Sequence, residues 1–201
     1  AFDGWYKGET LLGAVENGET LSAALATANL NKTEAGNYAD TTYTAKFAKD
    51  DNNDGVPDKY QVAVTFKVVN GSWNDETAEE KTVYVNLYKD GVLAEDGSGK
   101  LSADQIPAVG EKPAEGYKAG EWDTTPDTAT AISAETTYTY TYAVDDSQTY
   151  TVTYTTDGNG TVDPTNQSEQ VLSTTAITGS KATANSGYAF DGWYKGETLL
   201  G

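Results

Sequence analysis

The stretch AFDGWYKGETLLG, residues 1–13, occurs again without a single change as residues 189–201. The second copy begins at Ala189, 188 residues after Ala1. A long identical repeat is typical of proteins built by copying a module that stacks on its neighbours. An active site, by contrast, needs one specialised arrangement of residues. The duplication therefore predicts a tandem array with a structural or multivalent role and no enzymatic activity.

The composition of the 201 residues excludes several classes of function. The 13 basic residues, all Lys, stand against 31 Asp and Glu, which gives a net charge of −18. Because so acidic a surface repels phosphate backbones and anionic lipids, we expect neither nucleic acid nor a membrane as a partner. The absence of His and Cys removes the commonest nucleophiles, proton shuttles and transition-metal ligands.

The chain contains neither a membrane-spanning run of about 18 apolar residues nor a signal segment at its start. We therefore expect it to be an internal part of a longer protein, with the targeting signals elsewhere.

Three segments alternate apolar or aromatic residues with polar ones, which is the pattern of strands that bury one face. The first two end in Asn-Gly and Asp-Gly, dipeptides typical of tight hairpin turns. The segments are 61–70 (QVAVTFKVVN, followed by the turn at Asn70-Gly71), 81–91 (KTVYVNLYKDG, with Asp90-Gly91) and 136–143 (TTYTYTYA). The predicted inward faces are Val62, Val64, Phe66 and Val68 in the first segment and Tyr138, Tyr140 and Tyr142 in the third.

The same order of motifs occurs twice, which divides the chain into modules. Residues 41–48 (TTYTAKFA) resemble 136–143, and residues 149–160 (TYTVTYTTDGNG) resemble the beginning of the module at 60–143. We therefore expect the chain to begin and end inside a module. The predicted division is the C-terminal part of a module at 1–48, an acidic linker at 49–59, a complete β-rich module at 60–143, a linker at 144–148 and the N-terminal part of the next module at 149–201.

One helix is expected near 18–30, so the predicted fold class is α+β, mostly β. In this segment Leu21, Leu25 and Ala28 share a helical face, while Asn17, Glu19 and Thr20 offer capping and acidic first-turn residues. We expect large aromatic rings to dominate each small core. The expected core residues are Trp5, Trp122, Trp193 and the strand tyrosines.

Residues 186–196, SGYAFDGWYKG, resemble the Gly-Tyr-x-Phe-x-Gly-Trp-Tyr signature of the Listeria–Bacteroides repeat family. This family is related in pattern to the B repeats of internalins and to mucin-binding repeats. The module at 60–143 departs from the signature, because its GYKAGEW lacks the Phe and the trailing Tyr. The resemblance implies tandem β-grasp-like modules on Gram-positive cell-surface proteins, where they serve as spacers or adhesive repeats. It implies no catalytic residues.

The sharpest chemical motif is KDDNNDGVPDKYQ, residues 49–61. It contains oxygen donors at positions 1, 3, 5, 7 and 9 of a calcium loop, with Gly55 at the sharp turn. Gln61 replaces the bidentate Glu of an EF-hand, and the predicted flanks are strands, so the motif is closer to calcium-binding connectors between extracellular modules. The alternative is a solvated turn rich in Asp and Asn. The predicted calcium ligands are Asp50, Asn52, Asp54, Val56 and Asp58.

The sequence thus favours a stalk or spacer segment of a large bacterial cell-surface adhesin, extracellular and attached to the cell wall, whose partners are neighbouring repeats. The alternative is a multivalent repeat that binds host glycans or mucin through exposed aromatic side chains. Buried rings would favour the stalk, and a groove of exposed rings would favour the glycan-binding repeat. Because the first and last segments are complementary parts of one module, we also expect copies of this chain to associate head to tail.

Overall fold

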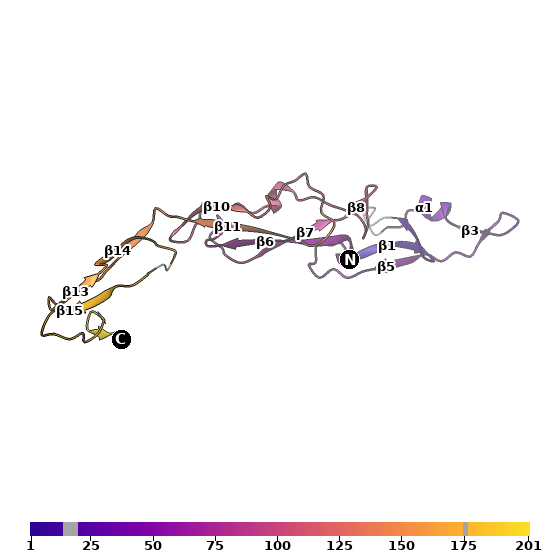
Figure 1. Cartoon of the computed structure of the whole chain (residues 1–201). Helices are drawn as coiled ribbons and strands as arrows, with labels where there is room; N and C mark the ends of the chain where they lie inside the picture. Colours follow the sequence, from indigo (N-terminus) through magenta and orange to yellow (C-terminus); the bar gives the residue numbers. More distant parts are fainter. Residues whose placement is uncertain (14–19, 175–176) are drawn as a thin grey trace.

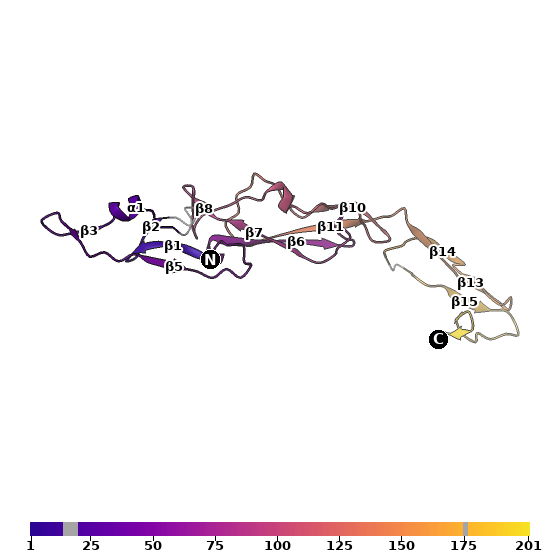
Figure 2. The same ribbon diagram turned by 180° about the vertical axis from the view of Figure 1, so that it is seen from behind.

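The computed structural model describes residues 1–13, 20–174 and 177–201, which form strands and one short α-helix. The sheets follow one another along an elongated molecule (Figures 1 and 2). A three-stranded N-terminal sheet lies towards one end, a four-stranded central sheet lies in the middle, and the C-terminal strand pairs lie at the other end. The expectation of a mostly β protein with a small helical component is confirmed.

The central sheet has the strand order β10-β11-β6-β7. Its two middle strands, β6 and β11, run parallel, with pairs from Thr136↔Val64 to Thr141↔Val69, whereas the outer strands pair antiparallel. Because β6 is the first of these strands and β11 the last, the chain enters the sheet at one end and leaves it at the opposite end. The strands are β6 (Gln61–Val69), β7 (Lys81–Asn86), β10 (Tyr117–Trp122) and β11 (Thr136–Val144).

The core lies on one face of the central sheet. Val64 and Phe66 of β6 are fully buried, and the ring of Tyr138 on β11 stacks on Phe66 with centroids 5.7 Å apart. Tyr140 and Tyr142 of β11 are buried as well. The alternation read from the sequence is therefore confirmed for both middle strands.

Trp73 occupies the centre of this core, although the strand pattern does not single it out. Its side chain is 0% exposed and its Nε1 donates a hydrogen bond to the carbonyl of Glu79 at 2.9 Å. The three tryptophans expected to dominate the cores, Trp5, Trp122 and Trp193, are only partly buried. Trp122 nevertheless packs against this core, and the expected strand tyrosines are buried. The expectation does not include Trp73, which the loop before β7 places over the sheet.

The predicted tight hairpin at Asn70-Gly71 is also wrong, since residues 70–80 form a long loop. A Cβ atom at Gly71 would lie 2.5 Å from the ring of Tyr142, so this glycine permits close approach of the loop to β11. The turn predicted at Asp90-Gly91 is present, with φ values of 53° and 83°. It joins the paired strands β8 (Tyr88–Lys89) and β9 (Val92–Leu93).

The N-terminal sheet has the order β2-β1-β5 and contains the first copy of the repeated stretch. Phe2 of β1 is buried, and its ring packs edge to face on Phe47 of β5 with centroids 5.8 Å apart. The strands are β1 (Phe2–Lys7), β2 (Thr10–Gly13) and β5 (Thr44–Phe47), with the short pair β3 (Asn31–Lys32) and β4 (Tyr38–Ala39) before β5.

The helix α1 (Ala23–Ala28) is shorter than the predicted 18–30. Ser22 is its N-cap and accepts a hydrogen bond from the backbone N–H of Leu25 at 3.2 Å. The predicted capping residues Asn17 and Glu19 lie outside the described residues. No residue of α1 is buried, so no apolar face lengthens the helix. None of the described helices is long and apolar enough to span a membrane.

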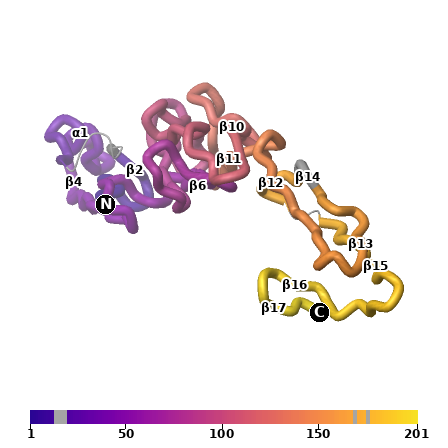
Figure 3. The backbone as a smooth tube through the Cα atoms, turned by 90° about the vertical axis from the view of Figure 1, so that its left-hand side faces the viewer, coloured from indigo at the N-terminus to yellow at the C-terminus, as the bar shows by residue number. Residues whose placement is uncertain are grey.

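The C-terminal part consists of three separate strand pairs, β12-β14, β13-β15 and β16-β17 (Figure 3). In the described residues, none of these pairs is extended by a third strand. The strands are β12 (Thr149–Thr153), β13 (Gly160–Asp163), β14 (Asn166–Val171), β15 (Lys181–Ala184), β16 (Tyr194–Lys195) and β17 (Thr198–Leu199). The described residues also form the short 3-10 helices η2 (Asp58–Tyr60) and η3 (Ala103–Gln105).

We expect Trp73→Ala to lower the free energy of unfolding of the central sheet by about 3–5 kcal/mol, the usual cost of truncating a buried aromatic side chain. Tyr84→Ala is the matched control, because Tyr84 lies in β7 of the same sheet and is 42% exposed. Scanning calorimetry of both variants measures the difference. Equal losses would contradict the placement of Trp73 at the centre of the core.

Candidate functional site

Residues 50–58 form a loop between the N-terminal sheet and β6. Gly55 has a φ of 89°, which lets the chain turn sharply. Asp50 Oδ1 and Asn52 Oδ1 both accept a hydrogen bond from the backbone N–H of Asp54, at 3.2 and 3.1 Å. The loop is therefore folded by Asx-type contacts that gather three of the predicted ligands.

The other two predicted calcium ligands make different contacts. Asp58 accepts a hydrogen bond from the backbone N–H of Asp51 at 3.0 Å, and the N–H of Val56 donates to Asp54 Oδ1 at 2.9 Å. Gln61 Nε2 closes the loop by donating to Asp54 Oδ2 at 2.6 Å. Across the described ranges, no group of three or more His, Cys, Asp or Glu side chains that could hold a metal is found. Calcium binding remains a prediction.

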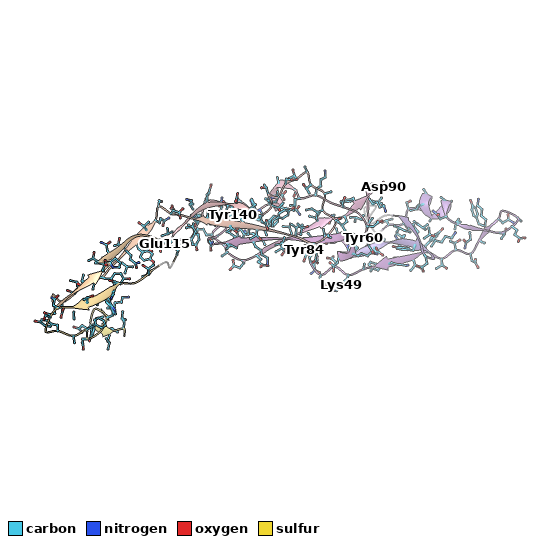
Figure 4. All side chains as sticks on the ribbon, in the orientation of Figure 1. Lys49, Tyr60, Tyr84, Asp90, Glu115 and Tyr140 are labelled. Carbon is cyan, nitrogen blue, oxygen red and sulfur yellow. The ribbon has the colours of Figure 1, made fainter. Side chains whose placement is uncertain are left out.

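Next to this loop, Asp3 joins the N-terminal sheet to the start of the central sheet. It is the only buried charged residue in the described part of the chain. Its carboxylate accepts hydrogen bonds from the Tyr60 hydroxyl at 2.8 Å and the Tyr6 hydroxyl at 3.2 Å, and lies 2.9 Å from Lys59 Nζ. Figure 4 shows Tyr60 where the two sheets meet. Side chains from both sheets thus converge on one buried carboxylate.

The environment of Asp3 favours its charged form. Burial alone would raise the pKa of Asp3, but hydrogen bonds from Lys59 and Tyr60 and the charge of Lys59 lower it below its usual value. Burial and the hydrogen bond to Asp3 raise the pKa of Tyr60 to about 12. Burial would lower the pKa of Lys59, but its hydrogen bond to Asp3 raises it. Asp3 is therefore charged and Tyr60 protonated at every pH between 3.8 and 10.0, the ordinary pKa values of Asp and Tyr, and the contact contributes its full stability there.

The sequence pattern does not predict this cluster, because an Asp in a repeated strand gives no sign of burial. Its counterpart Asp191, in the second copy, is exposed and accepts a hydrogen bond from Tyr194 at 2.9 Å. The pairing of Asp with the Tyr three residues later is thus local to the repeated stretch. The contacts with Lys59 and Tyr60 depend on how the sheets meet.

The junction between the central sheet and β12 is a hydrogen-bonded turn at 145–148. The N–H of Gln148 donates to the carbonyl of Asp145 at 3.1 Å, and its side-chain Oε1 accepts from the N–H of Gly116 at 3.1 Å. Gly116 has a φ of 83°, and a Cβ there would lie 2.9 Å from Cβ of Ser173. Both junctions are therefore fixed by contacts as well as by short linkers.

The strand pairs β1-β5 and β10-β11 share one register. Trp5 lies opposite Ala45, and Trp122 lies opposite Tyr140. Ala45 and Tyr140 are matching residues of TTYTAKFA and TTYTYTYA. A β-bulge interrupts each pair just before the Trp. The sequence similarity of these segments therefore extends to the geometry of their strands.

The two identical copies of the repeated stretch have different surroundings. Phe2 is 7% exposed, whereas its counterpart Phe190 is 54% exposed. The Phe–Trp contact within each copy is the same, with centroids 6.3 Å apart in the first copy and 5.9 Å in the second. The first copy pairs with β5, and no described strand has that position beside the second. The neighbouring strand therefore decides whether Phe2 or Phe190 is buried.

A hollow of about 640 Å³ lies beside the second copy. It lies between residues at the end of β12, the pair β13-β15 and residues 188–196. Its aromatic lining consists of Tyr154, Tyr188, Phe190, Trp193 and Tyr194.

We expect Asp3→Asn to weaken the contact between the N-terminal and central sheets by about 1–3 kcal/mol, the usual cost of leaving buried partners without their acceptor. Hydrogen exchange at residues 2–7 and 58–61 measures the loss. Asp191→Asn, in the same local sequence, should leave both segments unchanged.

The pH dependence of this contact follows from the same groups. The Asp3 contribution should be lost as the pH falls through its lowered pKa, because protonation removes the charge that Lys59 and Tyr60 contact. The Tyr60 contribution should be lost as the pH rises from about 10 to about 12. Protection factors, which divide out the intrinsic pH dependence of amide exchange, give this measurement. Protection factors of the two segments that stay constant over both pH ranges in the parent protein would contradict the role of Asp3.

No curated protein and no solved structure matches this chain. A family model, the Listeria-Bacteroides repeat domain, matches residues 150–201. The matched segment begins in β12 and includes the second copy of the repeated stretch. The resemblance inferred from SGYAFDGWYKG is thus confirmed. Residues 150–201 of this chain belong to the Listeria-Bacteroides repeat family.

Proposed function

We propose that this chain is a stalk segment of a large bacterial cell-surface adhesin, which projects a distal binding domain away from the cell wall. The proposal rests on the parallel pairing of β6 with β11, because this places the incoming and outgoing ends of the central sheet far apart. Membership of residues 150–201 in a repeat family supports a structural repeat in a surface protein. The proposed location is extracellular, on a Gram-positive cell wall, and no catalytic activity is assigned.

The proposed units of the stalk are tandem β-grasp-like modules. The strand order β10-β11-β6-β7 supports this for the central sheet. Its two middle strands, β6 and β11, are the first and last along the chain, and they run parallel. The shared register of β1-β5 and β10-β11 supports a second module of the same kind. Each unit would then have its neighbours at its two ends.

Fixed junctions support a stiff arrangement of these modules. The Asp3 cluster joins the N-terminal sheet to Lys59 and Tyr60, and Gln148 bonds to Gly116 at the other junction. Because these contacts limit rotation about the linkers, a stalk of such modules would keep its reach.

We further propose that calcium binds in the loop at 50–58 and stiffens the first junction. Asp50, Asn52 and Asp54 gather their side chains around the turn at Gly55, and all three supply the hard oxygen atoms that calcium prefers. The carboxylates repel one another, and a divalent cation would offset this repulsion. Val56 and Asp58 complete the proposed ligand set.

We expect calcium to slow trypsin cleavage after Lys49 and Lys59, since a cation that binds the folded loop stabilises it against opening. The measurement compares cleavage rates in calcium and in chelator by mass spectrometry. Asp54→Ala should remove the difference, whereas Asp51→Asn, which changes no proposed ligand, should keep it. Equal rates in calcium and chelator would remove the metal from the proposal.

The competing function is multivalent binding of host glycans or mucin. It is favoured by the hollow beside the second copy, where Tyr188, Phe190 and Tyr194 are 50–59% exposed. Aromatic faces of this kind can pack on sugar rings. Multivalency would supply the affinity that one shallow site lacks.

A glycan array and small-angle scattering of the whole chain separate the two functions. The stalk predicts an elongated particle in solution and no glycan retained. The glycan-binding repeat predicts retention that Trp193→Ala abolishes without lowering the melting temperature, because Trp193 lines the hollow and is only partly buried. A compact particle would contradict the stalk.

A further inference from the structure

Among the strands that have one edge unpaired in the described residues, β5 and β12 are complementary. β5 pairs with β1 on one side only, and β12 pairs with β14 on one side only. Unpaired backbone groups along such an edge are a template for pairing with another strand. The two edges belong to opposite ends of the molecule, so they cannot meet within one chain (Figures 1 and 2).

The central sheet shows how these two edges fit together. In it, β11 pairs with β10 on one side and runs parallel to β6 on the other. β5 matches β11 in sequence, and it pairs with β1 in the register in which β11 pairs with β10. Residues 149–154, TYTVTY, begin at β12 and match the QVAVTF of β6. β12 pairs antiparallel with β14, as β6 pairs antiparallel with β7.

An aromatic contact supports the correspondence between residues 149–154 and the first residues of β6. Phe66 and Trp122 meet edge to face in the central sheet, with centroids 6.1 Å apart and planes at 71°. Their counterparts Tyr154 and Trp193 meet in the same way, at 5.8 Å and 70°. The C-terminal part therefore contains the counterpart of β6 and, in residues 188–193, the sequence that matches β10. The hollow beside Tyr154 and Trp193 lies where the equivalent of β11 would be.

Burial at matching positions shows what the missing strand would supply. Val64 is fully buried on β6, whereas its match Val152 on β12 is only partly buried. Tyr142 is 1% exposed on β11, whereas its match Phe47 on β5 is 70% exposed. Both β5 and β12 therefore expose apolar surface at positions that are buried in the central sheet.

We propose that the N-terminal sheet of a second copy of this chain docks on the C-terminal part, with residues 41–46, which lead into β5, pairing parallel to residues 152–157, which begin at the end of β12. Transfer of the β11–β6 register predicts the pairs Thr41↔Val152, Thr42↔Thr153 and Tyr43↔Tyr154 between the two molecules. The resulting order, β1-β5-β12-β14, is that of β10-β11-β6-β7. This contact does not depend on the stalk function.

Replacing residues 190–195 of one molecule by β1 of another costs few contacts. The incoming β1 takes the place of residues 190–195. Because the two stretches are identical, Trp5 makes the contact with Tyr154 that Trp193 gives up. The gain is the ladder between residues 41–46 and 152–157 and the burial of Phe47. Since one end of each molecule joins the other end of the next, the contact is heterologous and propagates into open chains.

Disulfide trapping tests the register directly, because the chain contains no Cys. Thr42 and Thr153 are exposed, so Thr42→Cys and Thr153→Cys should both fold. An equal mixture of the two variants, oxidised in air, should give a covalent dimer whose 42–153 bond is identified by mass spectrometry. Thr151→Cys, shifted by two residues on the same exposed face, should give much less dimer with Thr42→Cys.

The double variant Thr65→Cys/Thr137→Cys is the internal reference, since this pair has the same position in the central sheet. It should form its disulfide within one molecule. Light scattering of the parent chain should show a mass that rises with concentration. Equal dimer yields with Thr153→Cys and Thr151→Cys, or a parent chain that remains monomeric at every concentration, would overturn the proposal.

Discussion

The parallel pairing of β6 with β11 determines how the rest of the molecule is arranged. Two parallel strands in one sheet need a long connection that crosses from the end of one to the start of the other. Here this connection runs over one face of the sheet and supplies the residues that a helix supplies in many such folds. Trp73, Leu101 and Ile132 come from it and pack on Val64 and Phe66. The core and the direction of the chain thus have one cause.

The junctions show how a chain of small sheets becomes one elongated body. At the first junction, a charged group is buried, which is unfavourable unless every partner is in place. Tyr6 is a local partner of Asp3, whereas Lys59 and Tyr60 reach its carboxylate only because the two sheets meet as they do. A hydrophobic contact would tolerate sliding. The buried carboxylate therefore fixes the orientation of the two sheets more than it strengthens the contact between them.

The sequence predicts those features that depend on local pattern. Strand faces follow alternation, and the Asp90-Gly91 turn follows the preference for positive φ. Trp73 is not predictable, because it lies in a loop where no period marks its side as inward. Asn70-Gly71 leads to a wrong prediction of a hairpin turn, because Gly71 instead permits close packing on Tyr142. The burial of Asp3 cannot be predicted from the sequence for a related reason. The identical stretch at 189–201 contains Asp191, which is exposed. Tertiary surroundings decided each of these outcomes.

The register of the central sheet has a mechanical consequence. Tension along the molecule enters the sheet at Gln61, the start of β6, and leaves it at Val144, the end of β11. These points lie at opposite ends of two adjacent strands, so the pull acts along the strands and across their hydrogen bonds. The bonds from Thr136↔Val64 to Thr141↔Val69 are then loaded in shear and must break together. A hairpin such as β8-β9, pulled at its two ends, would instead unzip one pair at a time.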